Sequence, residues 1–410
     1  MIEIFLSLQD PRELPKGSRD PLGYEVIWTR YGRKVVSNLT TITGSIEEFL
    51  TALLGFELSW TTDSDEQKNR FIRYEQVAGY LREYANRLEP QRKPGGFVRG
   101  VTRVAKRLEE LEARDNGFIT VSKDGRDMIL SSQAAYGLWG LYSTALEISG
   151  LIEARKVTPK GKEIVESMMR GDAGLMEFLN GFVENEVSQL SLQEVREYAD
   201  RFVALLQGGA QRMLLEVLLR GDEKSLQPEL FDFLESLDEA GYEELGGDVW
   251  KLVEACRQAG GRLGRALDDI ERLDRTLWLS SAFFDYLRLP QWSGKGLSEA
   301  IEELKKGASE RAVGLLELPA DLTIPELTAF RRAWNEGAWM EAAKRLLKRH
   351  ADIMSQREGA PWVEVESGGK LKIRVEAPNA TFDPSKPGHI YDYFLGAYLR
   401  IYEAYRKGRR

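Results

Sequence analysis

The sequence predicts a mainly α-helical protein with several domains. Apolar residues recur at intervals of three and four over most of the 410 residues, and this spacing places them on one face of a helix. Alternation with a period of two is limited to short stretches, of which residues 362–375 are the clearest. Because 42% of the residues are hydrophobic and a single core seldom extends beyond about 250–300 residues, the chain is expected to bury more than one core.

The first segment, residues 1–90, is expected to be a small helical domain. Asp20 followed by Pro21 is a typical N-cap and first-turn pair for one helix. Ser45 with Glu48 three residues later is the capping-box pattern at the start of a second helix. A third, longer helix is expected to end at the proline- and glycine-rich segment that follows.

Residues 91–171 are expected to form a basic module. The segment 89–100 contains two prolines and three glycines, so the preceding helix must end there. The pair Asp124-Gly125, between apolar and β-branched residues, favours a tight hairpin. The elements expected in this module are a helix over residues 101–114, a hairpin over 118–130, an apolar helix over 132–149 and a last helix that begins at Thr158-Pro159.

The rest of the chain is divided at a second loop that contains proline and glycine. Residues 172–290 show helical spacing with few breaks and are expected to form an acidic helical domain. Residues 291–410 are expected to form a C-terminal helical domain with a β-hairpin at 362–375. The last element is expected to be an amphipathic helix over about 389–406.

The charge of the chain is unevenly distributed. The formal net charge is −8, but residues 91–170 contain 14 Lys and Arg against 10 Asp and Glu, whereas residues 222–248 contain one lysine against ten acids. Both runs can be ordinary solvated helix faces, or they can be a basic docking face backed by an acidic one. In the second interpretation, basic side chains contact the phosphates of a nucleic acid. These residues are Arg92, Lys93, Arg99, Arg103, Lys106, Arg107, Lys123, Arg126, Lys156, Lys160 and Lys162.

Composition nearly excludes histidine and cysteine chemistry. The chain has one cysteine, Cys256, and two histidines, His350 and His389, which are too few for the common zinc sites unless carboxylates supply most ligands. Each histidine is interpreted as a helix-end residue. The sequence contains no P-loop, HExxH, CxxC or GxSxG pattern. We therefore expect no catalytic residue, no metal and no cofactor.

The hairpin expected at 362–375 leaves one catalytic alternative open. Glu364 and Glu366 on the first strand, with Lys370 and Lys372 on the second, are the residue types that metal-dependent phosphodiester cleavage requires. The same residues would also form an ordinary ladder of ion pairs on the solvent face of a hairpin. A nuclease therefore stays an alternative to a non-catalytic protein.

Residues 98–170 carry the most specific local signal. The turn Ser149-Gly150-Leu151-Ile152-Glu153 and the helix start Val157-Thr158-Pro159-Lys160-Gly161 resemble the end of a winged helix-turn-helix domain. The resemblance implies a winged-helix-like module whose recognition helix is 133–149. Because that helix is apolar almost all round, it is expected to be buried, which favours phosphate contact or protein docking over base reading.

A second, diffuse resemblance concerns the chain as a whole. Asp20-Pro21-Leu22-Gly23, Trp28, Leu39-Thr40 and the run Ala135-Tyr136-Gly137-Leu138-Trp139-Gly140-Leu141-Tyr142 are similar to uncharacterised helical accessory proteins of prokaryotic anti-phage defence gene clusters. The expected function is therefore a non-catalytic nucleic-acid-binding and scaffolding subunit of a prokaryotic multi-protein complex. Its expected partners are nucleic acid, contacted without base reading, and other protein subunits. A winged-helix transcriptional regulator is a further alternative.

The location expected from the sequence is the cytoplasm. Residues 1–30 carry acids and prolines instead of a basic segment followed by a continuous apolar one, so no signal peptide is recognised. Apolar stretches are shorter than the roughly 20 residues that span a bilayer, and no membrane association is expected.

Overall fold

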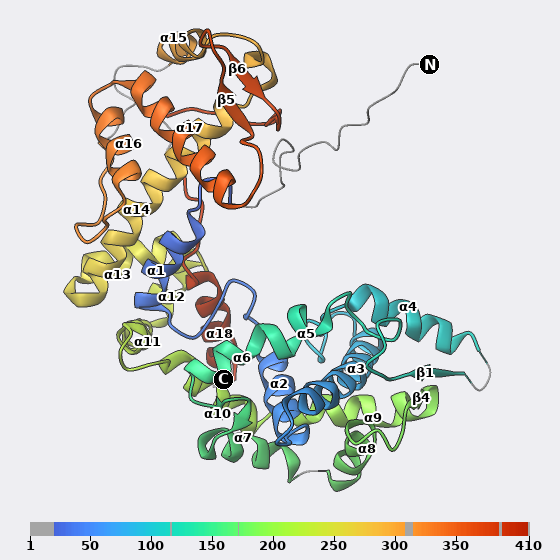
Figure 1. Ribbon diagram of the computed structural model, residues 1–410. Coiled ribbons are helices and arrows are strands. Elements are labelled where there is room, and N and C mark those ends of the chain that lie inside the picture. The colour runs from blue at the N-terminus through green and yellow to red at the C-terminus, as the bar shows by residue number, and fades with distance from the viewer. Residues whose placement is uncertain (1–19, 115–116, 171, 308–314, 385–387, 409–410) are drawn as a thin grey trace, which may run out of the picture. The chain divides into compact units, whose positions relative to one another are not determined.

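The computed structural model describes residues 20–114, 117–170, 172–307, 315–384 and 388–408, and it is mainly helical, as predicted (Figure 1). The chain divides into two compact units. The larger unit contains residues 33–252 and 394–410, and the smaller unit contains residues 1–32 and 253–393. Each unit therefore joins segments that lie far apart in the sequence. The sequence predicted a different kind of division, into four consecutive segments, and it stays a prediction. These segments are 1–90, 91–171, 172–290 and 291–410.

The larger unit is built around one long buried helix, α3 (Ser64–Leu88). Figure 1 shows this helix among its neighbours, and it packs against α2, α4, α8 and α9. Besides α3, the helices of this unit are α2 (Ile46–Leu58), α4 (Val101–Glu112), α5 (Gln133–Tyr136), α6 (Leu138–Ile148), α7 (Pro159–Met169), α8 (Ala173–Val183), α9 (Leu192–Leu205), α10 (Gly209–Arg220), α11 (Gln227–Ser236), α12 (Glu239–Leu245) and α18 (Leu395–Lys407).

The loop 89–100 is fastened to the helix that precedes it. The Arg82 guanidinium of α3 donates to the Gly95 and Phe97 carbonyls, and the Asn86 amide group donates to the Gly96 carbonyl. A β-carbon on Gly95 would lie 2.4 Å from the Arg82 carbonyl oxygen, so only glycine fits this close approach. The proline- and glycine-rich break thus returns the chain along α3 and places the start of α4 beside it.

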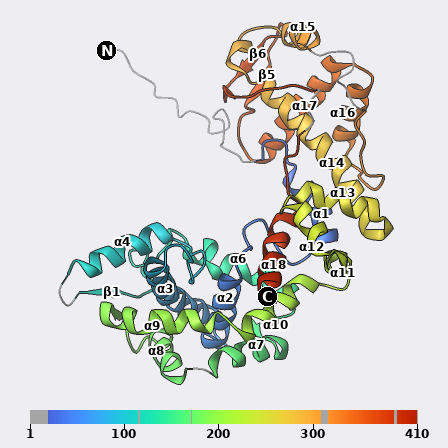
Figure 2. The same ribbon diagram turned by 180° about the vertical axis from the view of Figure 1, so that it is seen from behind.

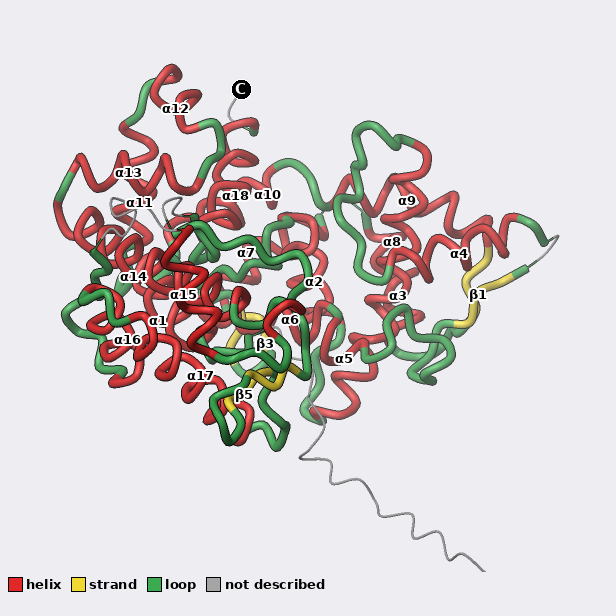
Figure 3. Tube along the Cα trace, turned by 90° about the horizontal axis from the view of Figure 1, so that it is seen from above, coloured by secondary structure: helices red, strands yellow, loops and turns green. Residues whose placement is uncertain are grey.

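The strands of the larger unit are short and form two antiparallel pairs. β1 (Phe118–Thr120) pairs with β4 (Gln189–Ser191), and β2 (Ile152–Glu153) pairs with β3 (Lys156–Val157). Figure 3 shows how little of the traced chain is strand.

The hairpin expected over residues 118–130 is wrong, because β1 pairs with β4 and not with the residues after the Asp124-Gly125 turn. Residues 121–130 instead form turns, in which the Ser122 hydroxyl donates to Asp127. The carbonyls of residues 126–128 accept hydrogen bonds from Arg107. Those peptide groups are therefore satisfied without a strand partner.

The single apolar helix expected over 132–149 is also wrong, because it breaks at Gly137 into α5 and α6. Gly137 has extended backbone angles, and the Leu138 N–H donates to the buried Glu75 carboxylate of α3. A neighbouring helix therefore supplies the N-terminal cap of α6. No pattern in the residues around Gly137 predicts such a cap.

The Thr158 cap agrees with its sequence pattern and allows a direct test. The Thr158 hydroxyl accepts the Gly161 N–H at the start of α7 and donates to the Gly150 carbonyl. Changing Thr158 to alanine is expected to lower the free energy of unfolding by about 1 kcal/mol in urea denaturation. Thr144→Ala, on the exposed side of α6, is the matched control. An equal loss in both variants would show that the cap contributes nothing specific.

The smaller unit packs aromatic side chains around a fully buried tryptophan, Trp334. Trp339 stacks on Trp334 with ring centres 5.4 Å apart, and Phe283 and Phe382 pack against it as well. The elements of this unit are α14 (Gly261–Tyr286), a 3₁₀ turn (Pro290–Trp292), α15 (Leu297–Gly307), α16 (Pro325–Asn335), α17 (Trp339–Gln356), β5 (Val363–Val365) and β6 (Leu371–Ile373). The chain passes between the units at three points, which lie within α1 (Glu25–Val35), within α13 (Val249–Ala259) and between Tyr393 and Phe394.

The two histidines are not helix-end residues, so that interpretation is wrong. His350 lies inside α17, where its Nε2 accepts the Trp362 N–H and its Nδ1 therefore carries the proton toward the Pro21 carbonyl. Burial lowers its pKa to about 4, and the ring is neutral at pH 7. His389 lies in a non-helical segment, 3.0 Å from the buried Asp274 carboxylate.

The last helix begins later than the pattern over 389–406 indicates. Asp274 accepts the N–H groups of Ile390 and Tyr391, which holds this stretch outside a helix. Phe394, with a φ of 67°, is the N-cap of α18.

Within the described ranges, no single helix is both long and apolar enough to cross a membrane. Taken together, α9 and α10 have the length and apolar composition of a membrane span, but the two helices are bent by 50° at the break between them.

Candidate nucleic-acid interface

The eleven basic residues predicted to contact phosphate lie in two parts of the larger unit. Lys156, Lys160 and Lys162 belong to β3 and α7, whereas the other eight lie on α4, on the loop before it and on the turns after β1. Figures 1 and 2 show α4 and α7 in different parts of this unit. The eleven residues therefore come from two separate groups of elements in this unit.

The clearest grouping of exposed cations is on α4 and the turn beside it. Arg103 and Lys106 project from α4, and Lys123 and Arg126 project from residues 122–127. The Arg103 side chain donates to the Met128 carbonyl at 3.4 Å, so this edge of the helix touches the turn. We call these four residues the α4 face.

Arg107 links α4 to the turn that carries Lys123 and Arg126. Its guanidinium donates to the carbonyls of residues 126, 127 and 128 and to the Tyr80 hydroxyl. Because these acceptors occupy the Nη1 and Nη2 donors, Arg107 holds the turn against α4 and leaves phosphate contact mainly to its neighbours.

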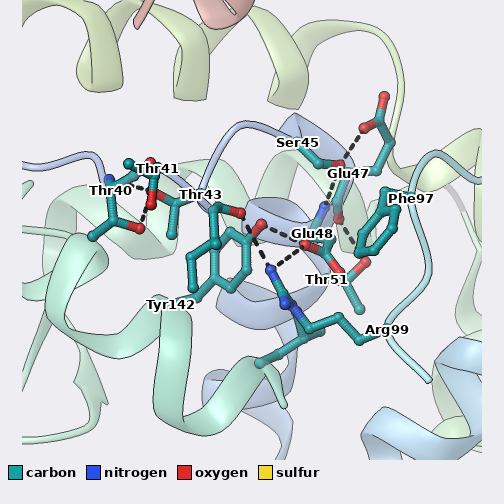
Figure 4. Close-up of polar contacts among 12 residues, drawn as sticks. Thr40, Thr41, Thr43, Ser45, Glu47, Glu48, Thr51, Phe97, Arg99 and Tyr142 are labelled. Atoms are coloured by element: carbon teal, nitrogen blue, oxygen red, sulfur yellow. Dashed lines mark hydrogen bonds and ion pairs between the residues drawn. The ribbon is translucent and has the colours of Figure 1, made fainter. Parts of the chain in front are cut away.

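Arg99 is directed into the larger unit and not toward solvent. Its guanidinium lies 3.3 Å from the Glu48 carboxylate and donates to the Ile42 carbonyl at 3.2 Å. The Tyr142 hydroxyl of α6 donates to the same Glu48 oxygen at 2.5 Å (Figure 4). Glu48 is only 1% exposed, and burial raises the pKa of its carboxyl group.

This buried cluster also corrects the capping-box prediction in part. The Ser45 hydroxyl does accept the Glu48 N–H at the start of α2. The Glu48 side chain, however, turns inward to Arg99 and Tyr142 instead of returning to Ser45 (Figure 4). The charge of Arg99 thus stabilises the interior, because it compensates a buried carboxylate.

A second buried carboxyl group, that of Glu75, caps the N-terminus of α6. Glu75 accepts the Leu138 N–H at 2.6 Å and the Gln133 side-chain amide at 3.0 Å. Burial raises the pKa of Glu75 to about 7. Along α6 the exposed residues are Thr144, Glu147 and Ile148, so this helix presents no cation to a groove.

Ion pairs separate the predicted cations into two sets. Five have a carboxylate partner, and these pairs are Arg92–Glu89, Arg99–Glu48, Lys106–Glu110, Arg126–Asp124 and Lys162–Glu57. Within the described residues, the remaining six have no carboxylate within ion-pair distance, and they are Lys93, Arg103, Arg107, Lys123, Lys156 and Lys160. A phosphate gains most from exposed cations of the second set, since no internal pair has to be broken.

The sequence prediction missed two residues beside the α4 face, Arg114 and Phe118. Arg114 is exposed at the end of α4, and the Phe118 side chain is 51% exposed. The alternation of Phe118, Ile119 and Thr120 in β1 was a usable signal, because burying Ile119 turns both neighbours outward. Arg114 has no ion-pair partner among the described residues.

The acidic segment 222–248 lies on α11, α12 and the loops around them, and α18 covers part of it. Glu235 accepts the Tyr402 hydroxyl, and Glu239 pairs with Arg406 at 2.6 Å. The exposed carboxylates that remain on this surface repel phosphate.

The carboxylates at 362–375 are engaged in ion pairs. Glu364 lies opposite Lys372 in the β5–β6 pair and 2.7 Å from Arg374, and Glu366 lies 3.6 Å from Lys372. Among the residues that the structure describes, no group of three or more His, Cys, Asp or Glu side chains is arranged to hold a metal ion. No observation here favours the nuclease alternative.

Comparisons with protein-family models, with curated proteins and with solved structures found no match for this chain. Its function is therefore inferred from its own residues.

Proposed function

We propose that this chain is a non-catalytic subunit of a prokaryotic multi-protein complex, in which it binds nucleic acid through phosphates and holds other subunits. The observation that carries the proposal is the α4 face, where four exposed cations lie on one helix and an adjoining turn. The proposed place in anti-phage defence rests on the sequence resemblance alone. The proposed winged-helix character of residues 98–170 rests on the turn and helix-start patterns quoted above.

Binding without base reading follows from where the charges lie. Cations on α4 and the turn release counterions from any phosphate backbone, whatever the base sequence. The helix that the winged-helix resemblance assigns to base reading is α6, whose first turn is capped internally by Glu75. A transcriptional regulator with a discrete operator is therefore the weaker alternative.

The scaffolding part of the proposal rests on the separation of charge. The acids of 222–248 make the surface of α11 and α12 unfavourable for nucleic acid. A nucleic acid is thereby directed to the α4 face, and the acidic surface is left for protein partners.

The proposal is tested by fluorescence anisotropy with labelled single-stranded DNA, duplex DNA and RNA over a salt series. A variant with Arg103, Lys106 and Lys123 changed to glutamate is expected to bind more weakly. The slope of log affinity against log salt should fall by about 2, since each lost contact removes roughly 0.7–0.9. These three side chains are exposed, so the variant should remain folded.

Lys224→Glu is the control, because it reverses an exposed charge within the acidic segment. It should leave affinity unchanged. An absence of binding by the natural protein at low salt would refute the proposed function, and so would an equal loss in the control.

A further inference from the structure

We infer, on the basis of the proposed function, that the ligand is a single-stranded nucleic acid and that one unpaired base stacks on Phe118. The site is a pocket of about 170 Å³ at the end of the α4 face. The residues that line it include Arg107, Glu110, Arg114, Phe118, Arg126 and Asp127.

The size of the pocket limits what it holds. It is smaller than the roughly 300–1,000 Å³ of pockets that bury drug-sized ligands. One base or one phosphate group is a suitable occupant, whereas a whole nucleotide cofactor would extend beyond it. The site therefore suits one unit of a longer chain.

Phe118 supplies the surface on which a base can stack. It lies in β1, where the pairing of Phe118 with Ser191 fixes the backbone. Its side chain is half exposed although it is fully apolar. Such an aromatic face, held on a paired strand beside cations, is the arrangement that binds single strands without sequence preference.

Three arginines line the same pocket as the ring, and two of them, Arg114 and Arg126, are exposed. The Arg114 guanidinium has no ion-pair partner within the described residues, and Arg126 is 89% exposed with Asp124 at 3.1 Å. Glu110 and Asp127 also line the pocket, but Glu110 faces Lys106 at 3.9 Å and Asp127 accepts the Ser122 hydroxyl. The charge of the three lining arginines exceeds that of the two acids, which favours a polyanion.

A duplex cannot use this site in the same way. Its bases are paired and stacked inside the helix, so Phe118 could reach one only after a base pair opens, at a cost of a few kcal/mol. A single strand exposes the faces of its bases, so no base pair has to open before a base stacks on Phe118. The pocket therefore predicts a preference for single strands that cations alone would not give.

The test compares a 12-nucleotide oligo-dT with a blunt duplex of the same length by anisotropy at one fixed salt concentration. The natural protein should prefer the single strand. Phe118→Ala should weaken single-strand binding roughly tenfold and leave duplex binding unchanged, because stacking on one aromatic ring contributes to the single strand alone. Phe118→Trp should retain the affinity, since it keeps an aromatic face.

Tyr136→Ala is the matched control, because Tyr136 is an aromatic residue that is 63% exposed and lies outside the pocket. Urea denaturation of each variant checks that it is folded. Equal binding of both probes by the natural protein would overturn the inference, as would unchanged single-strand affinity in Phe118→Ala. If the charge-reversal variant of the α4 face still lost binding in that case, the proposed function would stand. If no probe bound the natural protein, both would fall.

Discussion

Changing Arg99 to alanine is expected to lower the free energy of unfolding by about 3 kcal/mol or more. The substitution leaves the Glu48 carboxylate, which is 1% exposed, without the cation 3.3 Å away. Breaking a buried pair from one side typically costs about 3–5 kcal/mol, because an uncompensated charge stays in the interior. The loss is measured as the difference in the free energy of unfolding between the natural protein and the variant in urea denaturation.

Two further variants isolate the cause. Arg92→Ala makes the same change in the same loop, but the Arg92–Glu89 pair is exposed and its loss should cost less than about 1 kcal/mol. In a Glu48→Gln background, Arg99→Ala should cost much less than it does alone, because no buried charge is left behind. Equal costs in the two backgrounds would contradict the role assigned to the pair.

The stability of the larger unit is expected to fall by roughly 3 kcal/mol through Glu75 alone as the pH rises from about 4.5 to 7. Burial raises the pKa of Glu75 to about 7, so the folded chain binds this proton more tightly than the unfolded chain. The stabilisation is complete below the ordinary pKa of a glutamate and is lost as the pH passes through 7.

The measurement is the free energy of unfolding at pH 5 and pH 8 in the natural protein and in Glu75→Gln. The difference between the two pH values should change by roughly 3 kcal/mol in the variant, because glutamine cannot titrate. Glu147→Gln, at an exposed position of α6, should leave the pH dependence as it is. His350 contributes to the pH dependence in the opposite direction, because its lowered pKa makes the fold less stable in acid. This contribution is the same in the natural protein and in each variant, so it cancels when they are compared.

These two predictions concern residues that the sequence placed elsewhere. Glu48 was assigned to a helix cap, Arg99 to a phosphate-binding surface, and Glu75 to no site at all. Their partners lie 51 to 94 residues away in the chain, as with Glu48 and Tyr142, and no local pattern reports such a pairing. The α4 face was predicted more closely, because Arg103, Lys106, Lys123 and Arg126 are near one another in the sequence and all are exposed.

The sequence by itself determined the mainly helical class, the caps at Ser45 and Thr158 and the separation of basic from acidic segments. These properties depend on side chains within one helical turn or on simple counts of charge, so they are readable locally. The tertiary structure alone decided that β1 pairs with β4, that the helix over 132–149 breaks at Gly137, and that Arg99 points inward. Each depends on a partner brought close only by folding, because buried polar groups take whichever donor or acceptor the packed chain presents.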